Sequence, residues 1–215
     1  MQATHFIFDL DGTLLNTLGD LAQAVNASLS ARGYPTRTIE EVRQFVGNGI
    51  GKLIERSLPA DKKQERDTCL AEFRTFYEQH LMDFTAPYDG ILPLLDALRA
   101  RGKTLAVLSN KYDPAAKRLV THYFGDRVTL TLGERPNVPR KPDPTSALEI
   151  IDTLNADKAQ TIYVGDSGVD MNTAKNAGLY AVGVTWGFRS KEVLLENGAD
   201  ILIDHPDELL NLLEE

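Results

Sequence analysis

Short apolar runs alternate with helical segments through most of this chain, and this alternation limits the fold more than any other feature. After Pro87 the apolar runs have the length of buried strands and lie at 105–109, 128–132, 161–165, 180–185 and 200–203. Helical spacing fills the intervals around them, at 91–101, 113–123, 144–154, 168–177, 190–196 and 206–214. Such alternation predicts an α/β fold, a parallel sheet with helices on both faces.

The first expected strand, Thr4–Leu10, is separated from the others by a stretch with helical spacing and few β-rich runs. Helices are predicted there at 18–32, 50–57 and 61–82, the last as one long amphipathic helix. A capping-box pattern at Thr38 and Glu41 marks a further short helix.

Chain connectivity then predicts two domains. Residues 1–15 and 84–215 would form an α/β core, and residues 16–83 would form an all-helical cap inserted after the first strand. We see no internal repeat and no low-complexity tract that would divide the chain further.

The charge balance limits the partners of this chain. It has 23 Lys and Arg against 31 Asp and Glu, a net charge of −8, so no cationic excess exists to neutralise nucleic-acid phosphates. A small anionic substrate needs only local positive charge. We expect no signal peptide and no membrane span, and therefore a cytoplasmic location. The single cysteine, Cys69, is expected to be a structural thiol.

Polar side chains follow three of the expected strands, at the points where those strands end. They are Asp9 and Asp11 at the end of the first strand, Ser109 and Asn110 at the end of 105–109, and Asp166 and Asp170 after 161–165. Carboxyl ends of parallel strands meet at one edge of the sheet, where ligands bind. We therefore expect these side chains, together with Lys141 from the intervening loop, to converge on one crevice.

Four carboxylates in one crevice need a counter-charge, because adjacent carboxylates repel and cannot all stay ionised. Mg²⁺ meets this need, since it binds carboxylates, water and a substrate phosphate. The residues thus predict phosphoryl transfer, in which the metal and Lys141 neutralise a phosphate and one carboxylate attacks it. A tight turn at Gly12 would bring both Asp9 and Asp11 to the crevice, one as nucleophile and one as acid and base.

These motifs resemble those of the haloacid dehalogenase superfamily, in the same order along the chain. FDLDGTL at 8–14 is similar to the first motif, and SN at 109–110, KP at 141–142 and GDSGVD at 165–170 are similar to the other three. One such motif alone is a weak signal, whereas four in order are specific. The resemblance covers essentially the whole chain and implies a Rossmann-like core with a helical cap.

The resemblance also implies a catalytic role for each matching residue. Asp9 is expected to be the nucleophile that forms an aspartyl-phosphate. Asp11 is expected to protonate the leaving oxygen and then to activate water. Ser109 is expected to hold a phosphate oxygen, and Lys141 to orient and neutralise Asp9 and the phosphate.

It further implies which residues bind the cofactor and the substrate. Mg²⁺ is expected to be held by Asp9, the backbone carbonyl of Asp11, Asp166 and Asp170, the last directly or through water. Substrate contacts are expected from Gly12, Thr13, the backbone N–H of Asn110 and, in the cap, Gly47, Asn48 and Gly49.

Within the superfamily the chain looks most similar to the phosphoglycolate phosphatases. The similarity includes FVGNG at 45–49, PYDG at 87–90, SNK at 109–111 and TWGF at 185–188. It implies a small phosphorylated metabolite, 2-phosphoglycolate, as substrate. Asn16 stands where many relatives have an aspartate. We expect a monomer or a homodimer.

The turn at Gly47–Gly49 has two interpretations. It is either a plain connector between helices or a loop whose backbone N–H groups meet the substrate. Lys52 and Arg56 follow at i, i+4 spacing, and they would either meet a substrate carboxylate or form a solvated face.

Other functions stay open at this point. A β-phosphoglucomutase-type mutase would share the cap and motifs, although such mutases carry a histidine where this chain has Leu21. An inorganic pyrophosphatase of the same fold is harder to exclude. Dehalogenases and phosphonatases are disfavoured because they lack the second aspartate, Asp11. A non-catalytic binding protein would have lost Asp9, Asp11 or Lys141, and all three are present.

Overall fold

The computed structural model describes residues 2–213, so the last residue of the helix expected at 206–214 lies outside the described residues. The chain divides into two compact units. The first takes in the chain up to Leu15 and from Pro87 onward, and the second is Asn16–Ala86. Between residues 2 and 213, no helix combines the length and apolar character needed to cross a membrane.

The first unit is built on a parallel sheet of six strands in the order β5-β4-β1-β6-β7-β8, as far as the described residues extend. The strands are β1 (His5–Phe8), β4 (Thr104–Tyr112), β5 (Leu130–Glu134), β6 (Thr161–Gly165), β7 (Tyr180–Val184) and β8 (Ile201–Ile203). β1 lies between β4 and β6, so the strand order reverses around it. The α/β fold expected from the sequence is confirmed, and ligands bind at such a reversal.

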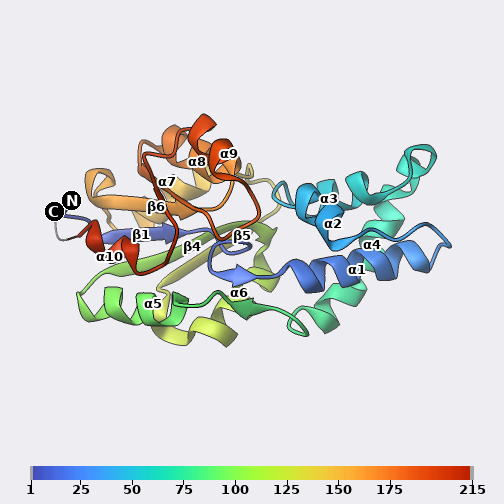
Figure 1. The fold of residues 1–215 in the computed structure, drawn as a ribbon, viewed down its shortest axis with the longest axis horizontal. Coiled ribbons are helices and arrows are strands. Elements are labelled where there is room, and N and C mark those ends of the chain that lie inside the picture. The colour runs from blue at the N-terminus through green and yellow to red at the C-terminus, as the bar shows by residue number, and fades with distance from the viewer. Residues whose placement is uncertain (1, 214–215) are drawn as a thin grey trace. The chain divides into compact units, whose positions relative to one another are not determined.

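Helices cover both faces of this sheet (Figure 1). On one face lie α7 (Thr145–Thr153), α8 (Gly168–Ala177) and α9 (Lys191–Glu196), and on the other lie α5 (Ile91–Ala100), α6 (Asp113–Phe124) and α10 (Glu208–Asn211). Strand side chains alternate between the two layers, so Ile7 joins the core beneath α7 and α8 while Phe6 and Phe8 are buried in the other layer. Burial on both faces explains why the strands are continuous apolar runs.

Short elements complete the description of the chain. The 3₁₀ turns η2 (Gly125–Arg127) and η3 (Lys158–Gln160) precede β5 and β6. β2 (Leu15–Asn16) and β3 (Ala86–Pro87) form a two-stranded sheet at the two points where the chain passes between the units.

The second unit is helical, with α1 (Leu18–Ser30), α2 (Ile39–Phe45), α3 (Ile50–Ser57) and α4 (Arg66–His80). The capping box is confirmed: the Thr38 hydroxyl accepts from the Glu41 N–H at 3.2 Å, and the Glu41 carboxylate accepts from the Thr38 N–H at 2.8 Å. The single long helix expected at 61–82 is wrong. Residues Ala60–Glu65 form a separate 3₁₀ helix, η1, because this polar segment buries no residue and has no apolar stripe to hold it in register with α4.

A buried carboxylate ties the start of α1 to the segment by which the chain leaves the second unit. Asp20, in the first turn of α1, is fully buried. Its Oδ1 accepts from the Phe84 N–H at 2.8 Å, and its Oδ2 accepts from the Thr85 N–H at 2.9 Å and the Thr85 hydroxyl at 2.6 Å. A negative charge in the first turn is also favoured by the helix dipole.

We expect Asp20→Ala to lower the free energy of unfolding by about 3 kcal/mol, because it removes a buried acceptor of charge-assisted hydrogen bonds. Urea unfolding measures this loss. Asp61→Ala is the control, since Asp61 lies on an exposed part of the same unit and should change stability by less than about 0.5 kcal/mol. Equal stability of Asp20→Ala and wild type would contradict the role given to these bonds.

Candidate active site

The turn after β1 carries Asp9 and Asp11 at the carboxyl end of the central strand. The N–H groups of residues 14 and 15 both bond to the carbonyl of Leu10, at 3.0 and 2.9 Å, which reverses the chain. Gly12 has a φ of +89°, a conformation that other residues rarely adopt. A Cβ at Gly12 would lie 2.3 Å from Asp166 Oδ2, so glycine also lets the next carboxylate approach the turn.

Three buried carboxylates meet beyond this turn. Oxygen atoms of Asp9, Asp166 and Asp170 lie within 4.8 Å of one another, and they come from the end of β1, the loop after β6 and the first turn of α8. Asp9 Oδ1 is buried and accepts no well-aligned hydrogen bond, although the Lys141 ammonium lies 2.9 Å away. Three hard oxygen donors with one unsatisfied acceptor fit a divalent cation such as Mg²⁺.

Lys141 supplies positive charge inside this cluster. Its Nζ lies 2.7 Å from Asp170 Oδ1 and 2.9 Å from Asp9 Oδ1, and it donates to the Leu108 carbonyl at 3.0 Å. Burial lowers the pKa of Lys141, but the charges of Asp170 and Asp9 raise it more, so that the pKa lies well above its ordinary value. Lys141 is therefore a fixed cation rather than a proton donor or acceptor.

Burial shifts the pKa of the carboxylates in the opposite direction, upward. Burial raises the pKa of Asp9 to about 7, and the charge of Asp170 adds to this rise while Lys141 opposes it. Burial likewise raises the pKa of Asp166 well above its ordinary value, with added contributions from Asp170 and Asp9. Without a cation the cluster therefore holds protons that a bound cation would displace.

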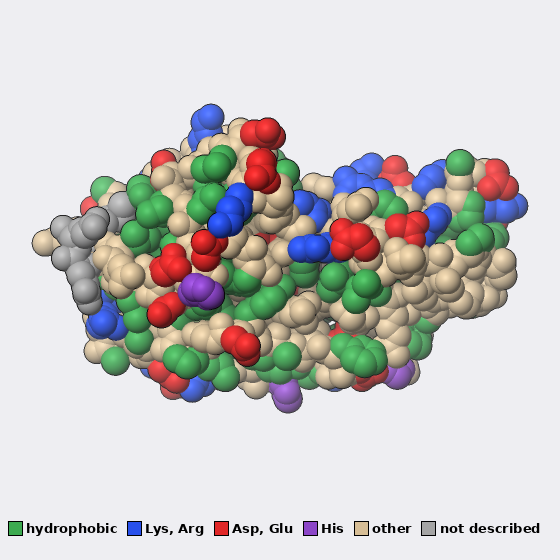
Figure 2. All heavy atoms as spheres, viewed as in Figure 1, with side chains coloured by type: hydrophobic (Ala, Val, Ile, Leu, Met, Phe, Trp, Pro, Cys, Tyr) green, Lys and Arg blue, Asp and Glu red, His purple; other side chains and the backbone are tan. Residues whose placement is uncertain are grey.

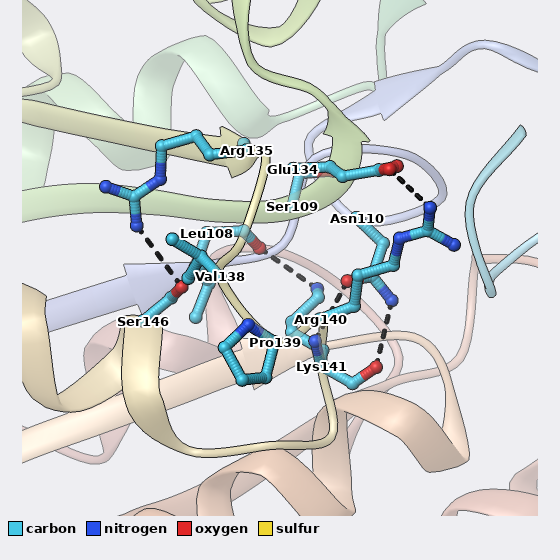
Figure 3. Close-up of a pocket in the computed structure, with 11 residues that line it drawn as sticks. Leu108, Ser109, Asn110, Glu134, Arg135, Val138, Pro139, Arg140, Lys141 and Ser146 are labelled. Atoms are coloured by element: carbon cyan, nitrogen blue, oxygen red, sulfur yellow. Dashed lines mark hydrogen bonds and ion pairs between the residues drawn. The ribbon is translucent and has the colours of Figure 1, made fainter.

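The loop that carries Lys141 is held by the side chain of Asn110. The Asn110 Oδ1 accepts from the Lys141 N–H at 3.0 Å, and its Nδ2 donates to the Lys141 carbonyl at 3.2 Å. Figure 3 shows this pair of bonds beside the ion pair between Arg140 and Glu134, which anchors the same loop to the end of β5. Asn110 was expected to act through its backbone N–H, and the structure adds this positioning role for its side chain.

Asp170 both caps a helix and joins the cluster. Its Oδ2 accepts from the Ser167 N–H at 3.1 Å and the Ser167 hydroxyl at 2.5 Å, while its Oδ1 faces Lys141. A Cβ at Gly165 would lie 2.3 Å from the Asp170 Cβ, so the helix can begin this close to β6 only after a glycine. Asp170 is thus both part of the capping box of α8 and a member of the carboxylate cluster.

Asp166 is oriented by a loop distant in sequence. Its Oδ2 accepts from the Phe188 N–H at 2.7 Å, and its Oδ1 accepts from the Thr13 hydroxyl at 3.4 Å. The Trp186 indole donates to the Thr13 carbonyl at 3.0 Å, and a Cβ at Gly187 would lie 2.4 Å from the Gly12 carbonyl oxygen. The segment 185–188, which entered the sequence analysis only as part of a resemblance, thus supports the first motif.

The structure gives Gly12 and Thr13 partners within the site itself. The Gly12 N–H donates to the Leu15 carbonyl at 2.9 Å, and Thr13 is fully buried with its hydroxyl on Asp166. Both residues hold the turn and the metal-ligand candidate in place, and contact of either with substrate stays a prediction.

Ser109 and Lys111 lie where the pairing of β4 with β5 is irregular. The register shifts between Leu108 and Tyr112, and such an irregularity re-aims side chains. Ser109 is buried with its Oγ accepting from the Lys111 N–H at 3.2 Å. The Lys111 ammonium donates to both oxygens of Asp11, at 2.9 and 3.1 Å. Sequence reasoning assigned Lys111 no role, and the only signal for it was its place in the SNK motif.

The candidate residues of the second unit lie in and after the turn between α2 and α3. Gly47 and Gly49 have φ of +118° and +81°, so the turn needs glycine at both positions. Arg56 donates to the Asn48 Oδ1 at 2.9 Å and to the Phe45 carbonyl at 2.8 Å, which braces the turn. Lys52 pairs with Glu55 at 2.8 Å. Figure 2 shows Lys and Arg side chains mixed with Asp and Glu over this unit, as these pairings require.

We predict that Mg²⁺ stabilises the protein more at about pH 8 than at about pH 5, because bound protons compete with the cation. The pKa of Asp9 is about 7 in the folded protein against an ordinary 3.8. Between these values the folded state binds a proton that the unfolded state has released, so metal-free stability falls as pH rises. Thermal unfolding with and without Mg²⁺ measures the effect. An equal rise in Tm at both pH values would argue against binding at these carboxylates.

Known proteins are similar to this chain in sequence and in fold. The haloacid dehalogenase-like hydrolase family matches residues 6–184. A phosphoglycolate phosphatase of Neisseria meningitidis is 36% identical over 214 residues, which cover 97% of this chain and 89% of that protein. One of Agrobacterium fabrum is 34% identical over 207 residues, which cover 92% and 87%. The crystal structure of a predicted phosphoglycolate phosphatase from Haemophilus somnus has a TM-score of 0.89 at 28% identity, covering 99% of this chain and 98% of that one.

The family match runs from β1 to the end of β7, and so includes all four motifs and the inserted helical unit. The resemblance noted in the sequence is thereby confirmed. This chain belongs to the haloacid dehalogenase-like hydrolase family.

Proposed function

We propose that this protein is a Mg²⁺-dependent phosphatase of small phosphomonoesters, with 2-phosphoglycolate as its substrate. The observation that carries the proposal is the buried cluster of Asp9, Asp166 and Asp170 around Lys141, at the carboxyl end of the sheet. Phosphoryl transfer needs a nucleophile and positive charge around the phosphate, and this cluster offers both. Relatives named as phosphoglycolate phosphatases support the choice of substrate.

Mg²⁺ would be held by Asp9, Asp166, the backbone carbonyl of Asp11 and Asp170, the last directly or through water. These are the hard oxygen ligands that the ion prefers. When bound, the ion would neutralise charge on the phosphate and favour the ionised form of the carboxylates.

In the first step Asp9 attacks phosphorus. A bond forms between an Asp9 carboxylate oxygen and phosphorus while the bond from phosphorus to the ester oxygen breaks. Asp11 gives its proton to the departing oxygen, so the product leaves as a neutral hydroxyl. Lys141 stays protonated and balances charge on the phosphoryl oxygens, which Ser109 and the Asn110 N–H also hold.

In the second step water releases the phosphate. Asp11, now a carboxylate, takes a proton from a water molecule, and the water oxygen attacks phosphorus. The bond between phosphorus and Asp9 breaks, which frees inorganic phosphate and restores both aspartates to their starting states. Water is consumed once for each ester bond broken, so the reaction is hydrolysis.

The second unit is proposed to act as the cap that selects the ester. It begins at Asn16, directly after the turn that carries Asp9 and Asp11. The site residues of the first unit all address phosphate or metal, so recognition of the organic group needs another surface. The turn at Gly47–Gly49 offers backbone N–H groups of the kind that bind a small carboxylate.

We expect Asp9→Asn to reduce phosphoglycolate hydrolysis by roughly 10³-fold or more while the fold is retained, because an amide of the same shape is a poor nucleophile. Steady-state release of phosphate measures activity, and circular dichroism checks the fold. Asp126→Asn is the matched control, since the Asp126 side chain is 92% exposed. Near wild-type turnover by Asp9→Asn would exclude the aspartyl-phosphate mechanism.

The same phosphate-release assay with pyrophosphate, and an assay of glucose 6-phosphate formation from β-glucose 1-phosphate, test the substrate separately from the mechanism. A higher kcat/KM for either than for phosphoglycolate would overturn the substrate assignment. Loss of activity in excess chelator, restored by Mg²⁺, is expected in every case.

We predict that Asn48→Ala raises KM for phosphoglycolate about tenfold, which corresponds to a loss of about 1.4 kcal/mol of binding free energy. KM for p-nitrophenyl phosphate should stay nearly unchanged. The substitution removes the Oδ1 that Arg56 binds and so loosens the turn. Gln64→Ala, at an exposed position of the same unit, is the control. Equal changes for both esters, or none, would show that the turn is a connector.

A further inference from the structure

We infer that Lys111 is a positioning residue for Asp11, and that it keeps the Asp11 side chain apart from the metal cluster so that it can exchange protons with the leaving group and with water. This inference rests on the proposed function. It concerns a residue for which neither the motif pattern nor the proposed chemistry supplied a role.

The geometry of the pair is specific. The Lys111 ammonium lies 2.9 Å from one Asp11 oxygen and 3.1 Å from the other, so both oxygens are bound by one donor. The Lys111 side chain is only 2% exposed and that of Asp11 is 15% exposed. A lysine buried this far is unusual unless it is paired. The pair therefore limits the orientations open to the Asp11 carboxylate.

The backbone around Lys111 is adapted to place it there. β4 loses its regular register with β5 between Leu108 and Tyr112, the stretch that contains Lys111. A Cβ at Gly133 of β5 would lie 2.6 Å from the Lys111 carbonyl oxygen, so β5 can come this close only with glycine. The Gly133 N–H also donates to the Asp113 carboxylate at 2.8 Å. These contacts hold the irregular stretch against its neighbour.

Charge explains why Asp11 needs such a partner. Asp9, Asp166 and Asp170 have carboxylate oxygens within 4.8 Å of one another, and the Asp11 side chain is not a member of that group in the part of the chain described. A fourth carboxylate next to a divalent cation would be drawn to the cation as a ligand, where it would be a poor proton carrier. Lys111 offers Asp11 a competing positive charge on its own side. The four acidic side chains thereby divide between metal binding and proton transfer.

The test compares esters whose leaving groups differ in their need for a proton. The first-step rate is read as kcat/KM, because the later hydrolysis of the aspartyl-phosphate is common to all esters. An alkoxide such as that from phosphoglycolate or ethyl phosphate needs protonation as it leaves, whereas p-nitrophenolate does not. We expect Lys111→Met to lower kcat/KM roughly 10²-fold for the two alkyl esters and less than about fivefold for p-nitrophenyl phosphate, as for a displaced general acid.

A double-mutant cycle shows whether Lys111 acts through Asp11. Asp11→Asn alone should give the same dependence on the leaving group, and adding Lys111→Met to it should cause little further loss. Lys117→Met is the matched control, since the Lys117 side chain on the adjoining helix is 53% exposed and its loss should leave kcat/KM unchanged for both kinds of ester. Lys111→Gln, which keeps a hydrogen-bond donor on a side chain one atom shorter, should retain more alkyl-ester activity than Lys111→Met and serves if the latter does not fold.

Three outcomes would overturn the inference. Equal losses for alkyl and aryl esters would indicate a structural role for Lys111 alone. Full additivity with Asp11→Asn would show that it acts independently of Asp11. Loss confined to phosphoglycolate, with ethyl phosphate unaffected, would mean that Lys111 binds the substrate carboxylate. Failure of the proposed function is distinguishable, because Asp9→Asn would then remain active.

Discussion

Repulsion among buried carboxylates is the constraint on which the rest of this structure depends. Asp9, Asp166 and Asp170 are brought together at one end of the sheet, where little water remains to screen them. Lys141 between Asp9 and Asp170 offsets part of this charge, but burial, together with repulsion from the neighbouring carboxylates, still raises the pKa of Asp9 and of Asp166. The remaining charge is what makes the cluster fit a divalent cation.

Each carboxylate of the cluster is held by a different kind of backbone support. Asp9 lies at the end of the central strand, Asp170 is fixed by its capping box with Ser167, and Asp166 is held by the Phe188 N–H from a distant loop. Glycines at 12, 165 and 187 leave room for these close approaches. Rigid support of this kind pre-organises charge before a ligand arrives, which is the main source of electrostatic catalysis.

The supports of Lys141 and Asp11 come from one irregular stretch of β4. Asn110 binds the backbone of Lys141 through its side chain, and Lys111 binds the carboxylate of Asp11. Two adjacent residues thus contact the fixed cation and the proposed acid and base. The shift in the register of β4 changes the direction of neighbouring side chains, so that Asn110 contacts Lys141 and Lys111 contacts Asp11.

The sequence by itself determined the parallel α/β sheet and the set of residues at its functional edge. Strand–helix alternation is a local pattern, and the carboxyl ends of parallel strands must meet, so Asp9, Asp166 and Lys141 could be expected to converge. The single helix predicted at 61–82 was wrong, because the polar segment Ala60–Glu65 has no buried residue and forms a separate 3₁₀ helix.

Only the tertiary structure decided which of the residues at that edge of the sheet form hydrogen bonds and ion pairs with one another. The bonds from Lys111 to Asp11, from Asn110 to Lys141 and from the Phe188 N–H to Asp166 join residues far apart in the chain. Such contacts depend on strand register, on the shift in β4 and on side-chain rotamers. Motif spacing specifies none of these, because it records the order of residues along the chain and not the direction in which each side chain points.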